Sequence, residues 1–236
     1  MRVERYNRGM CGRYALYGPR RRSREDNRYL DGLDAFPARY NVAPTDAMPI
    51  VRVTDGDVAP VAARWGLVPP WAKDVRIGAR YINAVSETLA TNKVFGPPFR
   101  RRQRCLVPAC GFFEWETRPD GSKQPYYFTS PDDTLLAFAG LWDVWCQPNG
   151  EPLPSYTILT VAPNDFVARF HDRMPVVLEA RDYERWLQDD DPREVLRACH
   201  NEALVNYPVS PRVGNVRHQE STLVAPLEGG GQGTLF

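Results

Sequence analysis

The stretch at residues 105–145, CLVPACGFFEWETRPDGSKQPYYFTSPDDTLLAFAGLWDVW, decides the fold class of this chain. It holds apolar or alternating β-rich runs at residues 105–116, 126–129 and 135–145, separated by groups of Pro, Gly, Asp and Ser. Short runs of this kind, bounded by turn-forming residues, are typical of β-strands. The stretch therefore predicts several consecutive strands with short connections.

The rest of the chain adds strands and short helices. Similar β-rich runs occur at residues 48–53, 61–67 and 156–161, and helical patterns occur at residues 23–33, 84–95, 164–170, 181–187 and 192–201. Ser23 is placed to cap the first helix, and Asp191 with Glu194 forms a capping box for the last. Strands outnumber helices without regular alternation, which predicts an α+β domain with a mainly antiparallel β-sheet or barrel core and peripheral helices.

The length and composition predict one domain. The chain has 236 residues and no internal break in composition, which favours a single globular unit over residues 11–227. Residues 1–10 carry three arginines and little apolar content, so they are expected to be a processed extension or a misassigned start. Residues 228–236 include four glycines and are expected to form a flexible tail.

Charge, hydropathy and cysteine usage narrow the classes of protein. The formal net charge is only +1, so a nucleic-acid surface would need local clustering of arginines. No apolar run reaches the roughly 20 residues of a membrane-spanning helix, and the N-terminus lacks the apolar segment of a secretory signal. Five irregularly spaced cysteines fit a reducing compartment and match no common zinc pattern. We expect a soluble, monomeric, cytoplasmic protein of bacterial or phage-related origin, associated with the nucleoid and without a metal site.

The segment MCGRY at residues 10–14 contains Cys11, which could become the first residue of the mature chain. An N-terminal cysteine carries an amine and a thiol on adjacent carbons, and the amine, with a reference pKa of about 7.7 to 8.0, is partly neutral at physiological pH. The amine can attack an aldehyde, and the thiol can then close a five-membered thiazolidine ring. The alternative is that Cys11 is a small buried residue of a first strand.

The segment GFFEW at residues 111–115 places Glu114 on the same strand face as Phe112, and Phe113 and Trp115 on the other face. A carboxyl group among aromatic side chains is partly desolvated, which raises its pKa and suits proton transfer near neutrality. The alternative is a solvated glutamate on an edge strand.

His171 and Asn83 lie at predicted element boundaries. His171 lies where a helix ends and an apolar run at residues 176–178 begins, and its imidazole could carry protons while Asp172 or a backbone carbonyl orients it. It could equally be a histidine hydrogen-bonded at a helix C-terminus. Asn83 precedes a predicted helix, where its amide could cap that helix or hold a sugar or an amine.

Two segments could hold a single-stranded nucleic acid. WGLVPPW at residues 65–71 is a proline loop flanked by Trp65 and Trp71, and arginines cluster at residues 100–104. Aromatic platforms beside cations bind single strands without sequence readout, because bases stack and phosphates pair with arginine. A core-packed Trp65 and a solvated arginine run are the alternative.

Together these segments resemble the SRAP (SOS response-associated peptidase) family. The matching segments, in family order, are MCGRY at 10–14, RYNVAPT at 39–45, RWGLVPPWA at 64–72, INA and ET between 82 and 88, GFFEW at 111–115, HDRMPVVL at 171–178 and YPVSPRVGNV at 207–216. The resemblance implies an α+β fold with an antiparallel β-rich core. It also implies covalent crosslinking to abasic sites in single-stranded DNA as part of the DNA damage response, with no cofactor.

The resemblance further implies a role for each site residue. Cys11 would be the nucleophile, and Asn83 would position the reacting groups. Glu114 would act as acid and base in opening the abasic sugar, and His171 would serve the proton transfers around it. The residues implied to contact DNA are Arg13, Asn41, Trp65, Trp71, Lys93 and Arg173. Self-removal of the initiator methionine is implied as well.

Two features depart from the family pattern. Val85 stands where the family usually has an arginine after the Asn-Ala pair, so we expect weaker DNA affinity and a salt dependence shallower by about one counterion. The extension would block the Cys11 amine, so it must be removed or translation must start at Met10. Two other functions stay open: a non-covalent single-strand binder, and a thiol hydrolase or peptidase using Cys11, His171 and Glu114.

Overall fold

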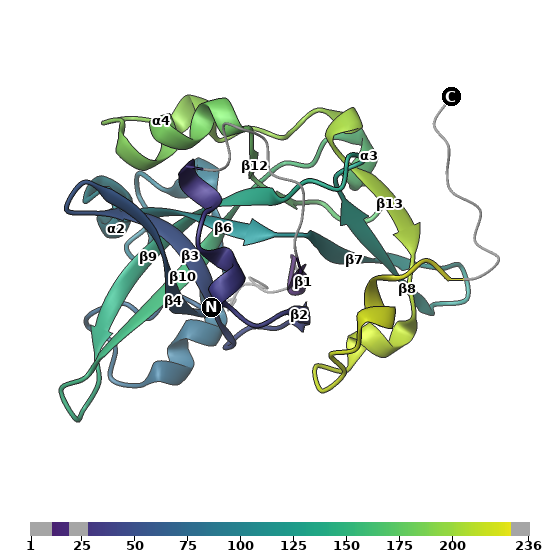
Figure 1. Ribbon diagram of the computed structural model, residues 1–236, viewed down its shortest axis with the longest axis horizontal. Helices are drawn as coiled ribbons and strands as arrows, with labels where there is room; N and C mark the ends of the chain where they lie inside the picture. The colour runs from purple at the N-terminus through teal and green to yellow at the C-terminus, as the bar shows by residue number, and fades with distance from the viewer. Residues whose placement is uncertain (1–10, 19–27, 228–236) are drawn as a thin grey trace, which may run out of the picture.

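A computed structural model describes residues 11–18 and 28–227. Its centre is a closed barrel of five strands, drawn on the left of Figure 1. In order around the barrel these are β10 (Pro152–Val161), β4 (Asp57–Trp65), β3 (Ala47–Thr54), β6 (Arg104–Ala109) and β9 (Leu136–Cys146), and β9 pairs again with β10. All pairings are antiparallel except β10 with β4, which is parallel.

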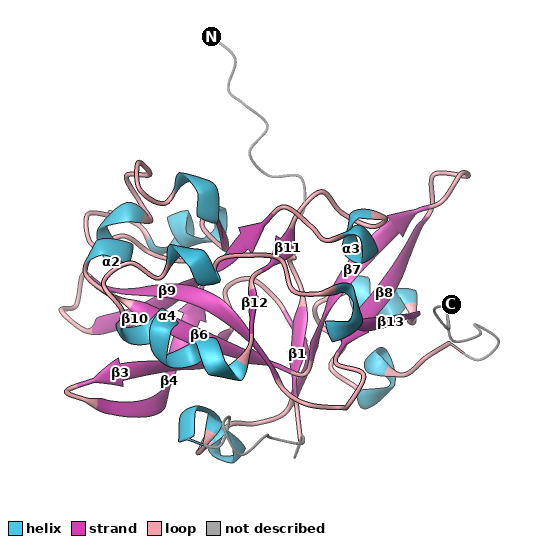
Figure 2. Cartoon of the chain, turned by 90° about the horizontal axis from the view of Figure 1, so that it is seen from above, coloured by secondary structure: helices cyan, strands magenta, loops and turns pink. Residues whose placement is uncertain are grey.

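A second sheet of five antiparallel strands lies beside the barrel (Figures 1 and 2). Its order is β13 (Val205–Pro208), β8 (Lys123–Thr129), β7 (Gly111–Thr117), β1 (Tyr14–Leu16) and β2 (Arg39–Val42). Three short strands extend the barrel: β5 (Asn83–Val85) runs parallel to β10, and β11 (Met174–Pro175) and β12 (Val177–Leu178) pair with β10 and β9.

The helices are short and lie around the sheets (Figure 2). The α-helices are α2 (Gly96–Arg100), α3 (Asp165–Ala168) and α4 (Tyr183–Gln188), and residues 28–30 are also helical. The 3-10 turns are η1 (Leu33–Ala35), η2 (Val75–Arg80), η3 (Ser86–Thr88), η4 (Ala180–Asp182), η5 (Arg193–Val195), η6 (Asn201–Ala203), η7 (Pro211–Gly214) and η8 (Ser221–Val224). None of the helices in the described ranges is long and apolar enough to cross a membrane.

Aromatic side chains join the second sheet to the barrel. The ring of Phe112 in β7 stacks on the ring of Phe128 in β8, with centroids 5.0 Å apart. The Phe112 ring also makes an edge-to-face contact with the ring of Phe138, a barrel residue, at a centroid distance of 5.9 Å. The opposite face of the sheet carries a separate apolar cluster formed by Ala15, Phe113, Tyr127, Val209, Val213 and Leu223. Strand β7 is therefore buried on both faces near its start. The next residue after Phe113, Glu114, is buried as well.

The fold class and most of the strands are confirmed, but the run at residues 105–116 is two strands. Cys110 separates β6 from β7, and its backbone N–H donates to Ala15 of β1 at 2.7 Å. At this point the chain leaves the barrel and enters the second sheet. Gly111 permits the crossing, because a Cβ there would lie 2.3 Å from the Phe128 carbonyl oxygen.

Two predicted helices are wrong. Residues 84–95 form β5, η3 and turns, because Asn83, Ala84 and Val85 pair with β10 instead of coiling. Residues 192–201 contain only the short turns η5 and η6, and the Asp191 carboxylate binds the Arg193 guanidinium instead of forming a capping box.

The helices at 164–170 and 181–187 are confirmed in shorter form as α3 and α4. Asn164 caps α3, since its side chain accepts the Val167 N–H at 2.9 Å. The expected extension at residues 1–10, the helix start at Ser23 and the tail at 228–236 lie outside the described residues.

Candidate active site

A pocket of about 750 Å³ opens beside the second sheet. Five separate parts of the chain form its walls: the segment before β1, strand β7, the start of β8, the loop after α3, and η7. The lining residues are Gly12, Arg13, Glu114, Trp115, Thr117, Lys123, Phe170, His171 and Gly214. Two of the four residues predicted to be catalytic, Glu114 and His171, therefore face one cavity.

Glu114 is a buried carboxyl group at the inner end of this pocket. Its side chain shares a strand face with Phe112, as the alternation predicted, and the residue is only 2% exposed. Burial raises the pKa of Glu114 to about 8, although a hydrogen bond from the backbone N–H of Cys11 and the positive charge of Lys123 both act to lower it. At neutral pH this carboxyl is therefore mostly protonated and can give or take a proton.

Cys11 lies against Glu114 and is 1% exposed. Burial, followed by the nearby Glu114 charge, raises the pKa of the Cys11 thiol well above its usual value, despite a hydrogen bond from the Arg13 backbone. The thiol is thus held in its neutral form. The backbone nitrogen of Cys11 donates to Glu114. This nitrogen would be the α-amine in a chain that begins at Cys11.

Asn83 reaches the same residue from the barrel side. It begins β5, which pairs with β10 through Ile158, Leu159 and Thr160. Its Nδ2 donates to the Cys11 carbonyl oxygen at 3.4 Å. The parallel pairing with β10, rather than a helix cap, places this amide beside Cys11.

His171 follows α3 and is held by its own loop. Its Nδ1 accepts the Arg173 backbone N–H at 3.0 Å and lies 2.9 Å from Asp172 Oδ1. The first contact needs an unprotonated Nδ1 and the second a protonated one, so the two are not hydrogen bonds at the same time. When Nδ1 accepts from Arg173, the ring carries a proton on Nε2 and can donate from that atom.

Arg173 is held by a carboxylate rather than left free. Its guanidinium binds both Glu87 oxygens, at 2.8 and 2.7 Å, and also donates to the Thr160 carbonyl at 2.6 Å. Arg173 keeps the pKa of Glu87 at about 2, so the pair stays charged at neutral pH. Arg13, by contrast, lines the pocket and donates to the carbonyls of Gly12 and Gly214.

The other residues predicted to contact DNA are divided between core and surface. Trp65 is fully buried and donates to the Ile82 carbonyl at 2.9 Å, which agrees with the core alternative. Asn41 is also fully buried, and its Nδ2 donates to the carbonyls of Val213, Asn215 and His218. Trp71 is 60% exposed and Lys93 is exposed, and neither lines the pocket.

The arginines at residues 101, 102 and 104 interact with other residues of the protein. Arg104 is buried, and its guanidinium donates to the carbonyls of Trp186 and Asp189 at the end of α4. Arg101 and Arg102 pair with Asp143 and Asp190.

Sequence reasoning missed Trp115, Lys123 and Gly214 as pocket residues. The turn at Asp120 and Gly121 gave a signal for Lys123, because a hairpin closed there pairs Lys123 with Thr117, as observed. Gly214 lies in a matched C-terminal segment, but no local pattern links that segment to the pocket. In the part of the chain that the structure describes, no three His, Cys, Asp or Glu side chains form a set that could hold a metal ion.

Comparisons with known proteins identify a family and similar proteins. The model of a family described as SOS response associated peptidase (SRAP) matches residues 10–216. Abasic site processing protein YoqW of Bacillus subtilis is 34% identical over 224 residues, which cover 91% of this chain and 99% of that protein. Abasic site processing protein HMCES of Gallus gallus is 33% identical over 191 residues, covering 70% of this chain and 56% of that protein.

A solved structure supports the fold independently. The crystal structure of a protein from Bacteroides thetaiotaomicron is similar with a TM-score of 0.73 and 24% sequence identity, covering 82% of this chain and 88% of that one. At this identity the likeness concerns the fold alone.

Proposed function

The chain belongs to the SRAP family, whose model matches residues 10–216, and on that premise we propose that it processes abasic sites in single-stranded DNA by covalent capture on Cys11. The observation that carries the proposal is the contact between the Cys11 nitrogen and the buried carboxyl of Glu114. It joins a nucleophilic nitrogen to an acid with a pKa of about 8, beside a thiol that burial keeps neutral.

The reaction begins once the Met10–Cys11 peptide bond has been hydrolysed, which consumes one water and frees the amine. We assign this self-processing to the same site. The amine adds to the aldehyde carbon of the ring-opened abasic sugar and forms a carbinolamine. Glu114 in its protonated form gives a proton to the departing hydroxyl, which leaves as water, and a Schiff base remains.

Ring closure follows on the same residue. The Cys11 sulfur bonds to the carbon of the protonated Schiff base, and the electron pair of the C=N bond returns to the nitrogen, which keeps its proton. The thiol proton passes to the Glu114 carboxylate, which regains its starting form. The sum is aldehyde plus aminothiol giving thiazolidine and water. Capture removes the aldehyde that activates the sugar for elimination, so the strand is shielded from breakage.

Asn83 positions Cys11, and His171 handles proton transfer at the oxygens of the sugar. Asn83 fixes the Cys11 backbone through its carbonyl. From its imidazolium form, which Asp172 stabilises, His171 gives the Nε2 proton to the sugar ring oxygen as the ring opens. It then takes up the proton that leaves the C1′ hydroxyl as the aldehyde forms.

The raised pKa of the Cys11 thiol disfavours the thiol hydrolase considered from the sequence, because such an enzyme needs a thiolate. The capture reaction has no such need, because its first nucleophile is the amine.

The test uses intact mass and a denaturing gel. The purified protein is weighed to establish that it begins at Cys11, and is then incubated with single-stranded DNA that carries an abasic site made by uracil excision. We expect a DNA-bound species that survives denaturation, and we expect Cys11→Ala to abolish it.

Cys146→Ser is the matched control, because Cys146 is exposed and lies on the β9–β10 hairpin away from the pocket. This variant should crosslink like the wild type. Absence of a stable adduct in a protein that begins at Cys11 would refute the proposal, and retained non-covalent affinity in that case would favour the simple single-strand binder.

A further inference from the structure

We propose that Lys123 is a phosphate contact of the active-site pocket, which binds the DNA backbone next to the abasic sugar. The inference rests on the proposed function for the identity of the DNA. Lys123 lies outside the short motifs, such as residues 111–115 and 171–178, that carry the family resemblance.

The β7–β8 hairpin brings Lys123 to the pocket. Lys123 begins β8 and pairs with Thr117, the last residue of β7, and both side chains line the cavity that holds Glu114. Lys123 is exposed, so the ammonium can meet a ligand from solvent. The antiparallel register fixes its position on the wall without contribution from a mobile loop.

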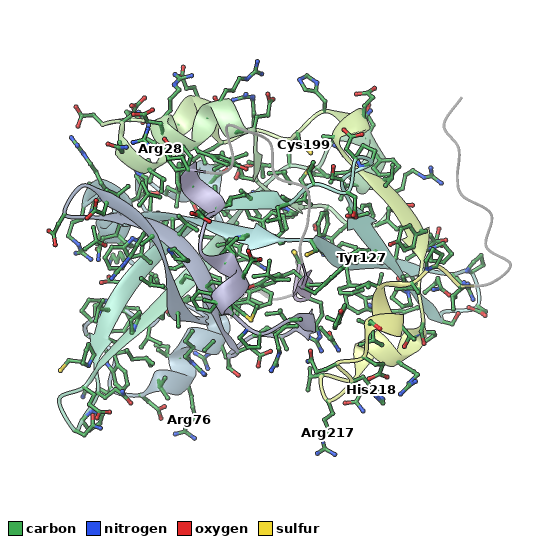
Figure 3. All side chains as sticks on the ribbon, in the orientation of Figure 1. Arg28, Arg76, Tyr127, Cys199, Arg217 and His218 are labelled. Carbon is green, nitrogen blue, oxygen red and sulfur yellow. The ribbon has the colours of Figure 1, made fainter. Side chains whose placement is uncertain are left out.

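The charge of Lys123 is available to a ligand. Its Nζ forms no hydrogen bond or ion pair with any residue of the described ranges. The other cationic residue of the wall, Arg13, already donates to two backbone carbonyls. Arg173 is bound to Glu87, and Arg217 points outward from the lower edge of the molecule (Figure 3).

The surroundings favour a phosphodiester over other ligands of the same charge class. Burial and the nearby Asp172 charge both raise the pKa of Glu114, which keeps it mostly protonated at neutral pH. Glu114 is the one carboxyl group that lines the pocket within the described ranges, and Asp172 lies beside the wall, paired with His171. The abasic sugar that reaches Cys11 carries a phosphate on either side. Among the described residues that line the cavity, Arg13 and Lys123 are the Arg and Lys side chains. A strongly hydrated point charge on a flexible stem suits a phosphate contact without base readout.

The same ammonium acts on the chemistry. Its positive charge lowers the pKa of Glu114, although burial dominates. Removing the charge should therefore raise that pKa further and move the alkaline limb of crosslinking to higher pH.

The experiment measures binding of single-stranded DNA that contains a tetrahydrofuran abasic analogue, which has no aldehyde and cannot crosslink. Affinity is followed between about 50 and 200 mM salt for wild type, Lys123→Gln, Lys123→Arg and Arg181→Gln. We expect the slope of log K against log salt to fall by about 0.7 in Lys123→Gln and to be kept in Lys123→Arg. Arg181 is an exposed residue paired with Glu179 near α4, and its variant controls for loss of one charge.

Two outcomes overturn the inference: an unchanged slope in Lys123→Gln, or an equal fall in Arg181→Gln. The pH profile of crosslinking to natural abasic DNA gives a second readout. The alkaline limb of this profile should shift to higher pH in Lys123→Gln and should stay at the wild-type position in Lys123→Arg. Failure of the proposed function looks different, because the wild type would then form no adduct while the Lys123 dependence of binding could still be measured.

Discussion

Glu114 is the residue whose environment departs most from that of an ordinary side chain of its type. The strand alternation puts it on the face of Phe112, and the packing of β7 against Phe128 and Phe138 removes it from water. A carboxyl with a pKa of about 8 binds a proton in the folded protein that it has released in the unfolded chain. This difference makes stability depend on pH.

Glu114→Gln should remove that dependence. The folded-state pKa lies above the unfolded value of about 4.3, so the stabilisation is fully present below that value and is lost as pH rises toward 8. The melting temperature of the glutamine variant should therefore rise relative to wild type as pH increases from about 5 to about 8. A constant difference across this range, measured by calorimetry, would contradict the raised pKa.

The family resemblance implies that Asn41 contacts DNA. In the structure its side chain is buried and forms hydrogen bonds within the protein. Its amide donates to three carbonyls of the segment that follows β13, and its backbone carbonyl accepts from Gln219 at 2.8 Å. The same segment supplies Gly214 to the pocket wall. Asn41 therefore holds in place the segment that contributes Gly214 to the pocket.

Asn41→Ala should lower the free energy of unfolding by about 1 to 3 kcal/mol, because buried carbonyls lose their donor. Urea denaturation measures this change. Asn149→Ala is the control, because Asn149 is exposed and its side chain exchanges hydrogen bonds with Glu151 on the β9–β10 hairpin. Full stability combined with lost DNA binding would instead favour the direct contact expected from the sequence.

At the scale of elements, the sequence predicts a strand well when its residues alternate in polarity or when it pairs with a neighbour in the chain. It does not predict a short strand whose pairing partner is far away in the sequence. The β7–β8 hairpin follows from its Asp-Gly turn, and β9 and β10 follow from long β-rich runs. Strand β5 has three residues and a partner more than 70 residues away, so its helix-like pattern could not reveal the pairing. The sequence allowed the candidate residues to be named, but not their arrangement, because the pairing of β5 with β10 brings Asn83 to Cys11.

The crossing from barrel to second sheet depends on Gly111. A Cβ at this position would lie 2.3 Å from the Phe128 carbonyl oxygen and 2.5 Å from the Tyr127 ring, and the backbone contact cannot move without breaking the β7–β8 pairing. The glycine therefore lets β7 run close to β8 three residues before Glu114.

Gly111→Ala should destabilise the protein by about 1 to 3 kcal/mol, the range typical of overpacking. It should also slow crosslinking, because β7 carries Glu114. Gly214→Ala is the control for stability, since a Cβ there meets nothing within 4 Å. Thermal unfolding compares the two variants, and an equal loss in both would show that the Phe128 contact does not limit the packing.

At the scale of the whole molecule, the charges nearly cancel, with 30 Lys and Arg against 29 Asp and Glu. Many guanidiniums are committed within the fold, among them Arg101 with Asp143, Arg102 with Asp190 and Arg185 with Glu194. The attraction for DNA must therefore come from the few cations around the pocket, and each should contribute visibly to the salt dependence of binding.

Val85→Arg tests this view by adding one cation to the segment that carries Asn83. Val85 is half-buried and pairs with Thr160 on β10, next to the carbonyl that holds Arg173. An arginine there should tighten binding of the tetrahydrofuran analogue at low salt and steepen the log–log salt slope by about 0.7. Ala59→Arg, on the exposed face of the β3–β4 hairpin, should leave the slope at the wild-type value, because the added charge lies far from the pocket and is screened. If both variants steepen the slope equally, the long-range field of the molecule rather than the local pocket governs DNA binding.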